Sequence, residues 1–284
     1  MCKYFKLNYK KFMMTKILLL FLVIVLFVGN FVNADSETAY NIGDYVINAT
    51  VLKNGNVHVS ECIKFDFHDV ANGIYRDILY RYTYSSQNSD MKPSSSRYQA
   101  DSIENILVTE TSSSYEDENK FSQISESNAR NGMKNYFSIS NIKNDGYIKR
   151  IKIYSPSQSS STKYLKIEYD LKDVAVLYKD FGEIYWNFVG KDWDCDISNL
   201  KININFEQEY NMENIRVYPH GYTDIINLVN EDGKISFEVE KLKRKTAVDS
   251  RVVFPASYLD PSVKKQLNEN YDFNTLNKIE KNME

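Results

Sequence analysis

The chain has 284 residues, of which 43% are hydrophobic and 14% aromatic, and its formal charge at pH 7 is -3. That length can bury a full core as one large domain or two small ones. The one short basic cluster lies at residues 241–245 and follows two glutamates, so we interpret it as a solvated strand end. A nucleic-acid partner, or a module held by anionic lipid, is therefore not expected.

The first 34 residues have the order of a secretory signal: five lysines, an uncharged stretch at 17–32, and the small-residue site Val32-Asn33-Ala34. The strongest apolar run, Ile17 to Val28, is shorter than the roughly 20 residues that span a bilayer. We expect cleavage after Ala34, and the alternative is an uncleaved membrane anchor. Under either reading the lysines stay cytoplasmic and the rest of the chain lies outside. Cleavage removes five lysines and no acid, which takes the formal charge from -3 to -8.

Alternation of apolar and polar residues predicts strands through most of the remaining chain. The clearest candidate is 57–65, and its expected partner is 45–52. A three-residue or bulged loop at Asn54-Gly55, with Gly55 in the left-handed region, would match the two apolar faces. This loop pairs Val51 with Val59.

Other turns and strands follow at short intervals. A two-residue turn at Asp232-Gly233 would align Leu228 with Phe237, and a turn at 144–146 would join two more strands. The further strands are predicted at 103–109, 136–142, 147–154, 163–170, 182–188, 199–206, 214–218 and 249–254. About a dozen strands with few helices predict an all-β fold, an antiparallel β-sandwich in a single, extended or doubled form.

Two stretches interrupt this rhythm. Residues 85–100 and 111–132 are rich in Ser, Asn and charge, and we expect surface loops there. After Pro255 the composition changes again, and Asp260 could cap a helix with Pro261 at its first position. The expected organisation is a signal or anchor at 1–34, a β ectodomain at 35–256 and a helical or flexible tail at 257–284.

Glu61 is an acid on the apolar face of the most regular strand. Burying an unpaired carboxylate is costly, so Glu61 should have a cationic partner or lie at the end of the sheet. Arg76 is the basic group of the apolar segment that follows. We predict a structural ion pair between them, with a ligand site or an exposed strand edge as alternatives.

A weaker candidate site lies in the run Asp192-Trp193-Asp194-Cys195-Asp196, where acids alternate as they do at the start of a calcium loop. The Gly and Glu that an EF-hand needs at its sixth and twelfth positions are absent, so neither a metal nor a cofactor is expected. Trp186 and Trp193 could stack on a sugar or peptide beside these acids. Aromatic residues at alternating strand positions are more typical of a core.

Two cysteines remain once the signal is removed, Cys62 and Cys195. Such a pair in an oxidising compartment could form one disulfide, but we expect two separate thiols. The Cys-x-x-Cys pattern is absent and the three histidines are scattered, so the sequence predicts no zinc site and no Cys–His nucleophile.

Three segments together resemble a known family: KNGNVHVSE at 53–61, GIYRD at 73–77 and YWNFVGKDWD at 185–194. In order and spacing they are similar to the N-terminal domain of the DUF2207 family of predicted bacterial membrane proteins. The resemblance covers about residues 40 to 255. It implies a secreted-side β domain behind a signal sequence, and it implies no activity. Family members usually continue into transmembrane helices, whereas this sequence ends at Glu284, so permanent anchoring is in doubt.

Two functions follow as hypotheses. The first is a non-enzymatic envelope module that binds a protein or stabilises an assembly, with membrane contact through the N-terminal segment. The alternative is a carbohydrate-binding or carbohydrate-cleaving sandwich at the cell surface. A glycosidase requires two carboxylates about 5 to 10 Å apart across a cleft. Exposed tryptophans beside Asp192 and Asp194 would favour the glycan hypothesis, and buried ones would count against it.

Overall fold

The computed structural model describes residues 38–82, 100–115, 118–143, 146–220, 227–229, 235–263 and 272–281. All of them belong to one compact unit, Thr38–Glu284. The signal or anchor expected at 1–34 and nearly all of the loop expected at 85–100 lie outside the described residues. No helix in the described ranges has the length and apolar character needed to cross a membrane.

Within these ranges the chain forms sixteen strands: β1 Tyr40–Val51, β2 Val57–Phe67, β3 Ile74–Tyr82, β4 Ser102–Thr111, β5 Glu118–Lys120, β6 Ser122–Gln123, β7 Tyr136–Lys143, β8 Gly146–Tyr154, β9 Ser161–Lys172, β10 Val176–Leu177, β11 Phe181–Val189, β12 Ile197–Phe206, β13 Arg216–His220, β14 Asn227–Val229, β15 Ile235–Leu242 and β16 Val248–Pro255. Three short 3-10 helices, η2 Glu126–Asn128, η3 Met212–Asn214 and η4 Ala256–Tyr258, and the α-helix α2 Phe273–Lys281 complete the described elements. Every predicted strand is present. The strands β3, β5, β6 and β10 are additional to those predicted.

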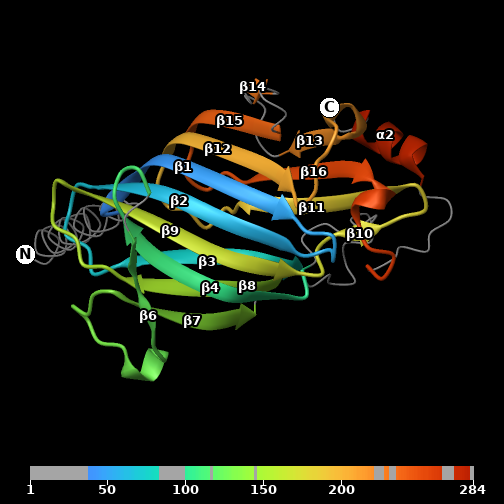
Figure 1. Cartoon of the computed structure of the whole chain (residues 1–284). Coiled ribbons are helices and arrows are strands. Elements are labelled where there is room, and N and C mark those ends of the chain that lie inside the picture. The colour runs from blue at the N-terminus through green and yellow to red at the C-terminus, as the bar shows by residue number, and fades with distance from the viewer. Residues whose placement is uncertain are drawn as a thin grey trace, which may run out of the picture. The chain divides into compact units, whose positions relative to one another are not determined.

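The largest sheet has eight strands in the order β14-β15-β12-β1-β2-β9-β4-β5 (Figure 1). Its strand β1 runs antiparallel to β2 but parallel to β12, with Ile42 opposite Ile197 and Val51 opposite Phe206. The prediction of a purely antiparallel sheet is therefore wrong. Alternation shows which residues face the core, but it carries no information on the direction of a neighbouring strand.

Two smaller sheets complete the unit, one in the order β10-β11-β16-β13 and one in the order β3-β8-β7-β6. Buried side chains of all three sheets share one apolar core, among them Ile63 of β2, Ile153 of β8 and Val252 of β16. The fold is thus mostly β, with mixed and antiparallel sheets around a common core.

The loop between β1 and β2 has the predicted bulged form, but the pairing of the two strands differs from the prediction. Val51 pairs with Val57, and Ala49 takes the place opposite Val59, so residues 52–56 lie between the paired ends. The Leu52 N–H donates to the Asn56 carbonyl at 2.9 Å. Within the loop the Gly55 N–H donates to the Leu52 carbonyl at 3.0 Å, and Gly55 has the expected positive φ of 83°. The predicted pairing is wrong by two residues. Because a shift of two keeps the side-chain parity, the apolar faces still match.

The strands flanking the other two predicted turns pair as expected. Leu228 lies opposite Phe237, and β7 pairs with β8 from Tyr136 opposite Tyr154 onward. The turn residues Asp232-Gly233 and residues 144–145 lie outside the described ranges.

The second expected loop contains strands that were not predicted, and the helix expected in the tail begins later than predicted. Within 111–132 the short strands β5 and β6 extend two of the sheets, and Phe121 between them is buried. In the tail, the described helix begins at Phe273 and not at Pro261. Its cap is Asp272, whose Oδ1 accepts a hydrogen bond from the Thr275 N–H at 2.8 Å. The Asp260 carbonyl accepts instead from the Val263 N–H in a short turn.

Candidate functional site

Glu61 lies in the middle of β2, opposite Ile47 of β1 and Ile167 of β9, and none of its surface is exposed. Its position follows from the alternation of the strand, since Val59 and Ile63 on either side are buried on the same face. A carboxylate in this place needs charge compensation inside the core.

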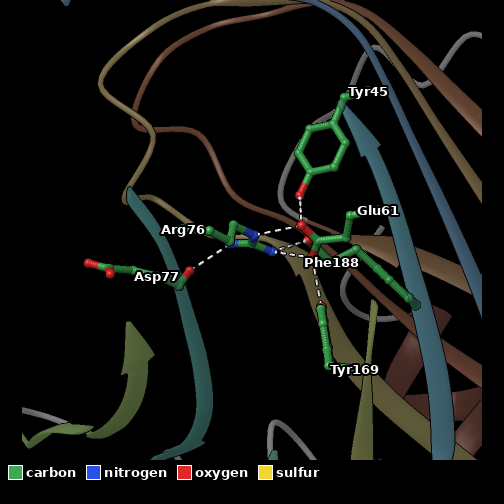
Figure 2. Close-up of polar contacts among 6 residues, drawn as sticks. All are labelled: Tyr45, Glu61, Arg76, Asp77, Tyr169 and Phe188. Atoms are coloured by element: carbon green, nitrogen blue, oxygen red, sulfur yellow. Dashed lines mark hydrogen bonds and ion pairs between the residues drawn. The ribbon is translucent and has the colours of Figure 1, made fainter. Parts of the chain in front are cut away.

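Arg76 supplies that compensation from β3. Its Nε donates to Glu61 Oε2 and its Nη2 to Glu61 Oε1, both at 2.8 Å, in a bidentate pair (Figure 2). Arg76 is 3% exposed, and its remaining N–H groups reach backbone carbonyls, that of Asp77 at 2.6 Å and that of Phe188 at 3.4 Å. Burial alone would lower the pKa of Arg76, but the charge and hydrogen bonds of Glu61 together with the two neighbouring tyrosines outweigh burial and hold that pKa well above its usual value. The structure therefore brings the two residues together as a buried, charged pair.

Two tyrosines complete the arrangement. The Tyr45 hydroxyl donates to Glu61 Oε2 and the Tyr169 hydroxyl to Glu61 Oε1, both at 2.7 Å (Figure 2). Burial raises the pKa of both phenols well above the ordinary value, so both remain donors. Each Glu61 oxygen thus accepts one bond from Arg76 and one from a tyrosine. Sequence reasoning missed both hydroxyls, although both tyrosines lie in predicted strands, Tyr45 in 45–52 and Tyr169 in 163–170.

The surroundings of this pair are closed. The guanidinium carbon of Arg76 lies 5.8 Å from the ring centroid of Trp193, which packs against Tyr45 at 6.1 Å between centroids. All four accepting positions of the carboxylate are used. Glu61 therefore has neither a free lone pair nor solvent access with which to bind a ligand or move a proton.

The acidic run at 192–196 lies at the surface and pairs with the basic cluster of the sequence. Asp194 contacts Lys245, and Asp196 Oδ2 accepts from Lys243 Nζ at 2.8 Å. Hydrogen bonds from Lys243 and from the Arg244 backbone lower the pKa of Asp196. These pairs explain why both clusters occur: each neutralises the other.

Asp192 and the two tryptophans do not form an exposed aromatic shelf. Trp186 is 2% exposed and Trp193 6%, and both belong to the main core. Asp192 is exposed, and its pKa is raised by partial desolvation and by the charge of Asp77. Across the ranges that the structure describes, no group of three or more His, Cys, Asp or Glu residues is arranged to hold a metal ion.

Cys62 and Cys195 are both free and buried. Cys62 lies on β2 beside Glu61, and Cys195 precedes β12. Burial raises the pKa of both thiols, that of Cys195 to about 12. They are poor nucleophiles at neutral pH, because the thiolate is the reactive form.

Comparison with protein families gives one match: the family model described as "Predicted membrane protein (DUF2207) N-terminal domain" covers residues 41–254. A search of the curated proteins found no match. The match spans all three sequence segments on which the resemblance was based.

The chain also has distant likenesses among solved structures. An M1 zinc metallopeptidase from Deinococcus radiodurans is 7% identical at a TM-score of 0.33, over 76% of this chain and 42% of its own. A proposed nutrient-binding protein from Legionella pneumophila is 8% identical at a TM-score of 0.40, over 76% of this chain and 68% of its own. The chain spans less than half the length of the metallopeptidase. At these scores the likenesses carry no functional argument.

Proposed function

Because the chain belongs to the DUF2207 family, whose description is that of a predicted membrane protein, we propose that it is a non-enzymatic extracytoplasmic module of the cell envelope. In this proposal residues 1–34 direct the chain across the membrane and the β unit faces outward. Its role is to bind an envelope protein or to stabilise an assembly.

The observation that carries the proposal is that Glu61, the strongest candidate for a chemical role, is buried and fully hydrogen-bonded. Glu61 has all four accepting positions filled by Arg76, Tyr45 and Tyr169, and it is fully buried. A catalytic acid or base needs a geometry in which it can reach the proton that it moves. We propose that the Glu61–Arg76 pair has a structural role, holding β3 against the large sheet, and that the three sheets close as a sandwich-type module.

The carbohydrate hypothesis is the weaker one. Its aromatic residues, Trp186 and Trp193, are buried in the core, so they offer no stacking surface. Asp194 and Asp196 are paired with lysines. A glycan role would therefore have to rest on residues other than those that suggested it.

Two experiments test the proposal. N-terminal sequencing of the exported form should begin at Asp35, whereas full-length chain in the membrane fraction would establish an uncleaved anchor. Cross-linking in intact envelopes followed by pull-down should recover a specific protein. Recovery of glycan alone, or retention of the chain in the cytoplasm, would contradict the proposal.

A further inference from the structure

The β10-β11-β16-β13 sheet carries a second buried polar cluster, on the face opposite the main core. Val252 and Phe254 of β16 point into that core, so Arg251 points away from it. Arg251 lies opposite Tyr185 of β11 and Tyr218 of β13 and is 3% exposed. Its guanidinium carbon lies 4.7 Å from the centroid of the Tyr185 ring. A cation is therefore held between two tyrosines.

Acidic and imidazole groups surround this arginine. Glu183 of β11 is fully buried, with its Oε1 3.8 Å from Arg251 Nε. In the next row of the sheet His220 lies opposite Asp249, which is also buried. The face thus presents an arginine and a histidine on adjacent strands.

Helix α2 covers this face, and Figure 1 shows it beside β13 and β16. Leu276 is fully buried in a small apolar cluster with Val253 and Phe181. One turn later, Glu280 places its Oε1 2.9 Å from Arg251 Nη1 and its Oε2 3.0 Å from His220 Nε2. Two further contacts hold the helix: the Phe273 ring lies 6.2 Å from the Phe181 ring, and Asn277 Oδ1 accepts from the Tyr218 hydroxyl at 2.5 Å. Among these contacts, Leu276 and Glu280 are the buried apolar residue and the buried acid, four positions apart.

The fit of this carboxylate is imperfect. Among the described residues, Glu280 Oε1 and His220 Nε2 are buried without an aligned hydrogen bond, although both lie at ion-pair distance. Glu61, by contrast, accepts four aligned bonds. A buried polar atom left unsatisfied costs free energy, so a carboxylate that aligns better would gain free energy that Glu280 does not. In addition, a helix of nine residues is marginal on its own, so α2 depends on the face that it covers.

We propose that the outward face of β11, β16 and β13 is a binding site for a carboxylate carried on an amphipathic helix, and that α2 occupies this site in cis as a displaceable segment. The ligand is an acidic helix of a partner protein with an apolar residue four positions before its acid, the spacing that Leu276 and Glu280 show. Arg251 and His220 recognise the acid, and Val253 with Phe181 receives the apolar residue.

The inference deepens the protein-binding role proposed above by naming the chemistry of the partner. It rests on that role for the claim that the ligand is an envelope protein, whereas the binding site itself can be tested separately. A failed envelope pull-down would leave the peptide assay below unaffected. A failed peptide assay would remove this site without excluding another protein-binding surface.

The test uses the full chain with Leu276→Asp, which places a charge against Val253 and Phe181 and is expected to release α2. The probe is a fluorescent peptide with the sequence of residues 272–281, and its matched control carries Glu280→Gln. We expect the native peptide to bind the Leu276→Asp chain, and to bind the unaltered chain at least about tenfold more weakly because the site is occupied. The Glu280→Gln peptide should also bind at least about tenfold more weakly, because it leaves the buried Arg251 without the charge that Glu280 places beside it.

Equal binding of the two peptides, or no binding to the released chain, would overturn the proposal. Circular dichroism shows whether Leu276→Asp stays folded, and the full-chain variant Glu280→Gln serves as the second receptor if it does not. Hydrogen exchange gives an independent measurement: excess native peptide should increase exchange in residues 272–281 of the unaltered chain. Unchanged exchange there would equally contradict a displaceable α2.

Discussion

Replacing Glu61 by Gln should be among the most damaging single changes to this protein. All four groups around the carboxylate are donors: Nε and Nη2 of Arg76 and the hydroxyls of Tyr45 and Tyr169. A Gln amide would place its own NH₂ against some of these donors. A tyrosine hydroxyl can turn to accept, but the guanidinium cannot. The substitution leaves a buried cation without a counter-charge.

The size of the effect follows from the burial. Removing one member of a buried ion pair costs about 3 to 5 kcal/mol, which is a large part of a domain stability of about 5 to 15 kcal/mol. Arg76→Met should have a comparable cost at neutral pH, because it leaves the carboxylate with only the two tyrosine hydroxyls. The stranded carboxylate can take up a proton, whereas a stranded arginine cannot lose one. The cost of Arg76→Met should therefore shrink as the pH falls, and that of Glu61→Gln should not.

The assay is urea unfolding followed by tryptophan fluorescence, since Trp193 lies beside Arg76. Arg150→Met is the matched control. Arg150 forms an equally bidentate pair with Asp77, at 2.7 and 2.6 Å, but its side chain is 38% exposed. The Asp77 side chain that this variant leaves behind is 11% exposed, so solvent reaches it in part and the control should lose clearly less than Arg76→Met.

The double variant Glu61→Gln/Arg76→Met should lose less than the sum of the single losses, because each substitution removes the charge that the other leaves unpaired. Additive losses in this cycle would refute the coupling of the two residues. A Glu61→Gln protein as stable as the unaltered chain would refute the structural role itself.

Three further predictions concern other sites. Because burial raises the pKa of Cys195 to about 12, its labelling rate in the native protein should keep rising tenfold per pH unit beyond pH 9, where an ordinary thiol levels off, and mass-resolved labelling would show this. Asp196→Asn should cost at most about 1 kcal/mol. The pKa of Asp196 is lowered in the folded state, so the difference in unfolding free energy between the two proteins should be present above pH about 4 and disappear as the pH falls further. Urea titrations at several pH values would measure this difference. Gly73→Ala should destabilise by about 1 to 3 kcal/mol, since an added Cβ would lie 2.1 Å from the Ile153 carbonyl oxygen, and an unchanged melting temperature would contradict this steric argument.

The sequence was informative wherever one face of a strand is buried and the other is exposed. Strand β2 alternates so regularly that Glu61 could be placed on the core face and assigned a cationic partner from the pattern alone. The register of its hairpin was less certain, because pairings that differ by two residues match the faces equally well. Only the five-residue loop around Gly55 decides between them.

The cluster beneath α2 could not be found in the same way. In β11 and β16 nearly every residue is buried, since one face meets the main core and the other is covered. The period-two signal is therefore absent, and nothing in the pattern distinguishes Glu183 or Arg251 from residues that point inward. Glu280, the partner of Arg251, belongs to a helix that the sequence placed only as part of a helical or flexible tail.

The parallel contact between β1 and β12 also fixes an order of events as the chain is made. One edge of β1 is closed by β2 almost at once, but the other must wait for a strand about 155 residues further along. Until β12 is available, the β1–β2 hairpin has an unpaired edge along β1, and unpaired strand edges associate readily with other chains. Pairing across such a separation is also slow. A chaperone that shields the first hairpin during synthesis should therefore raise the yield of folded protein more than one that acts after residue 206.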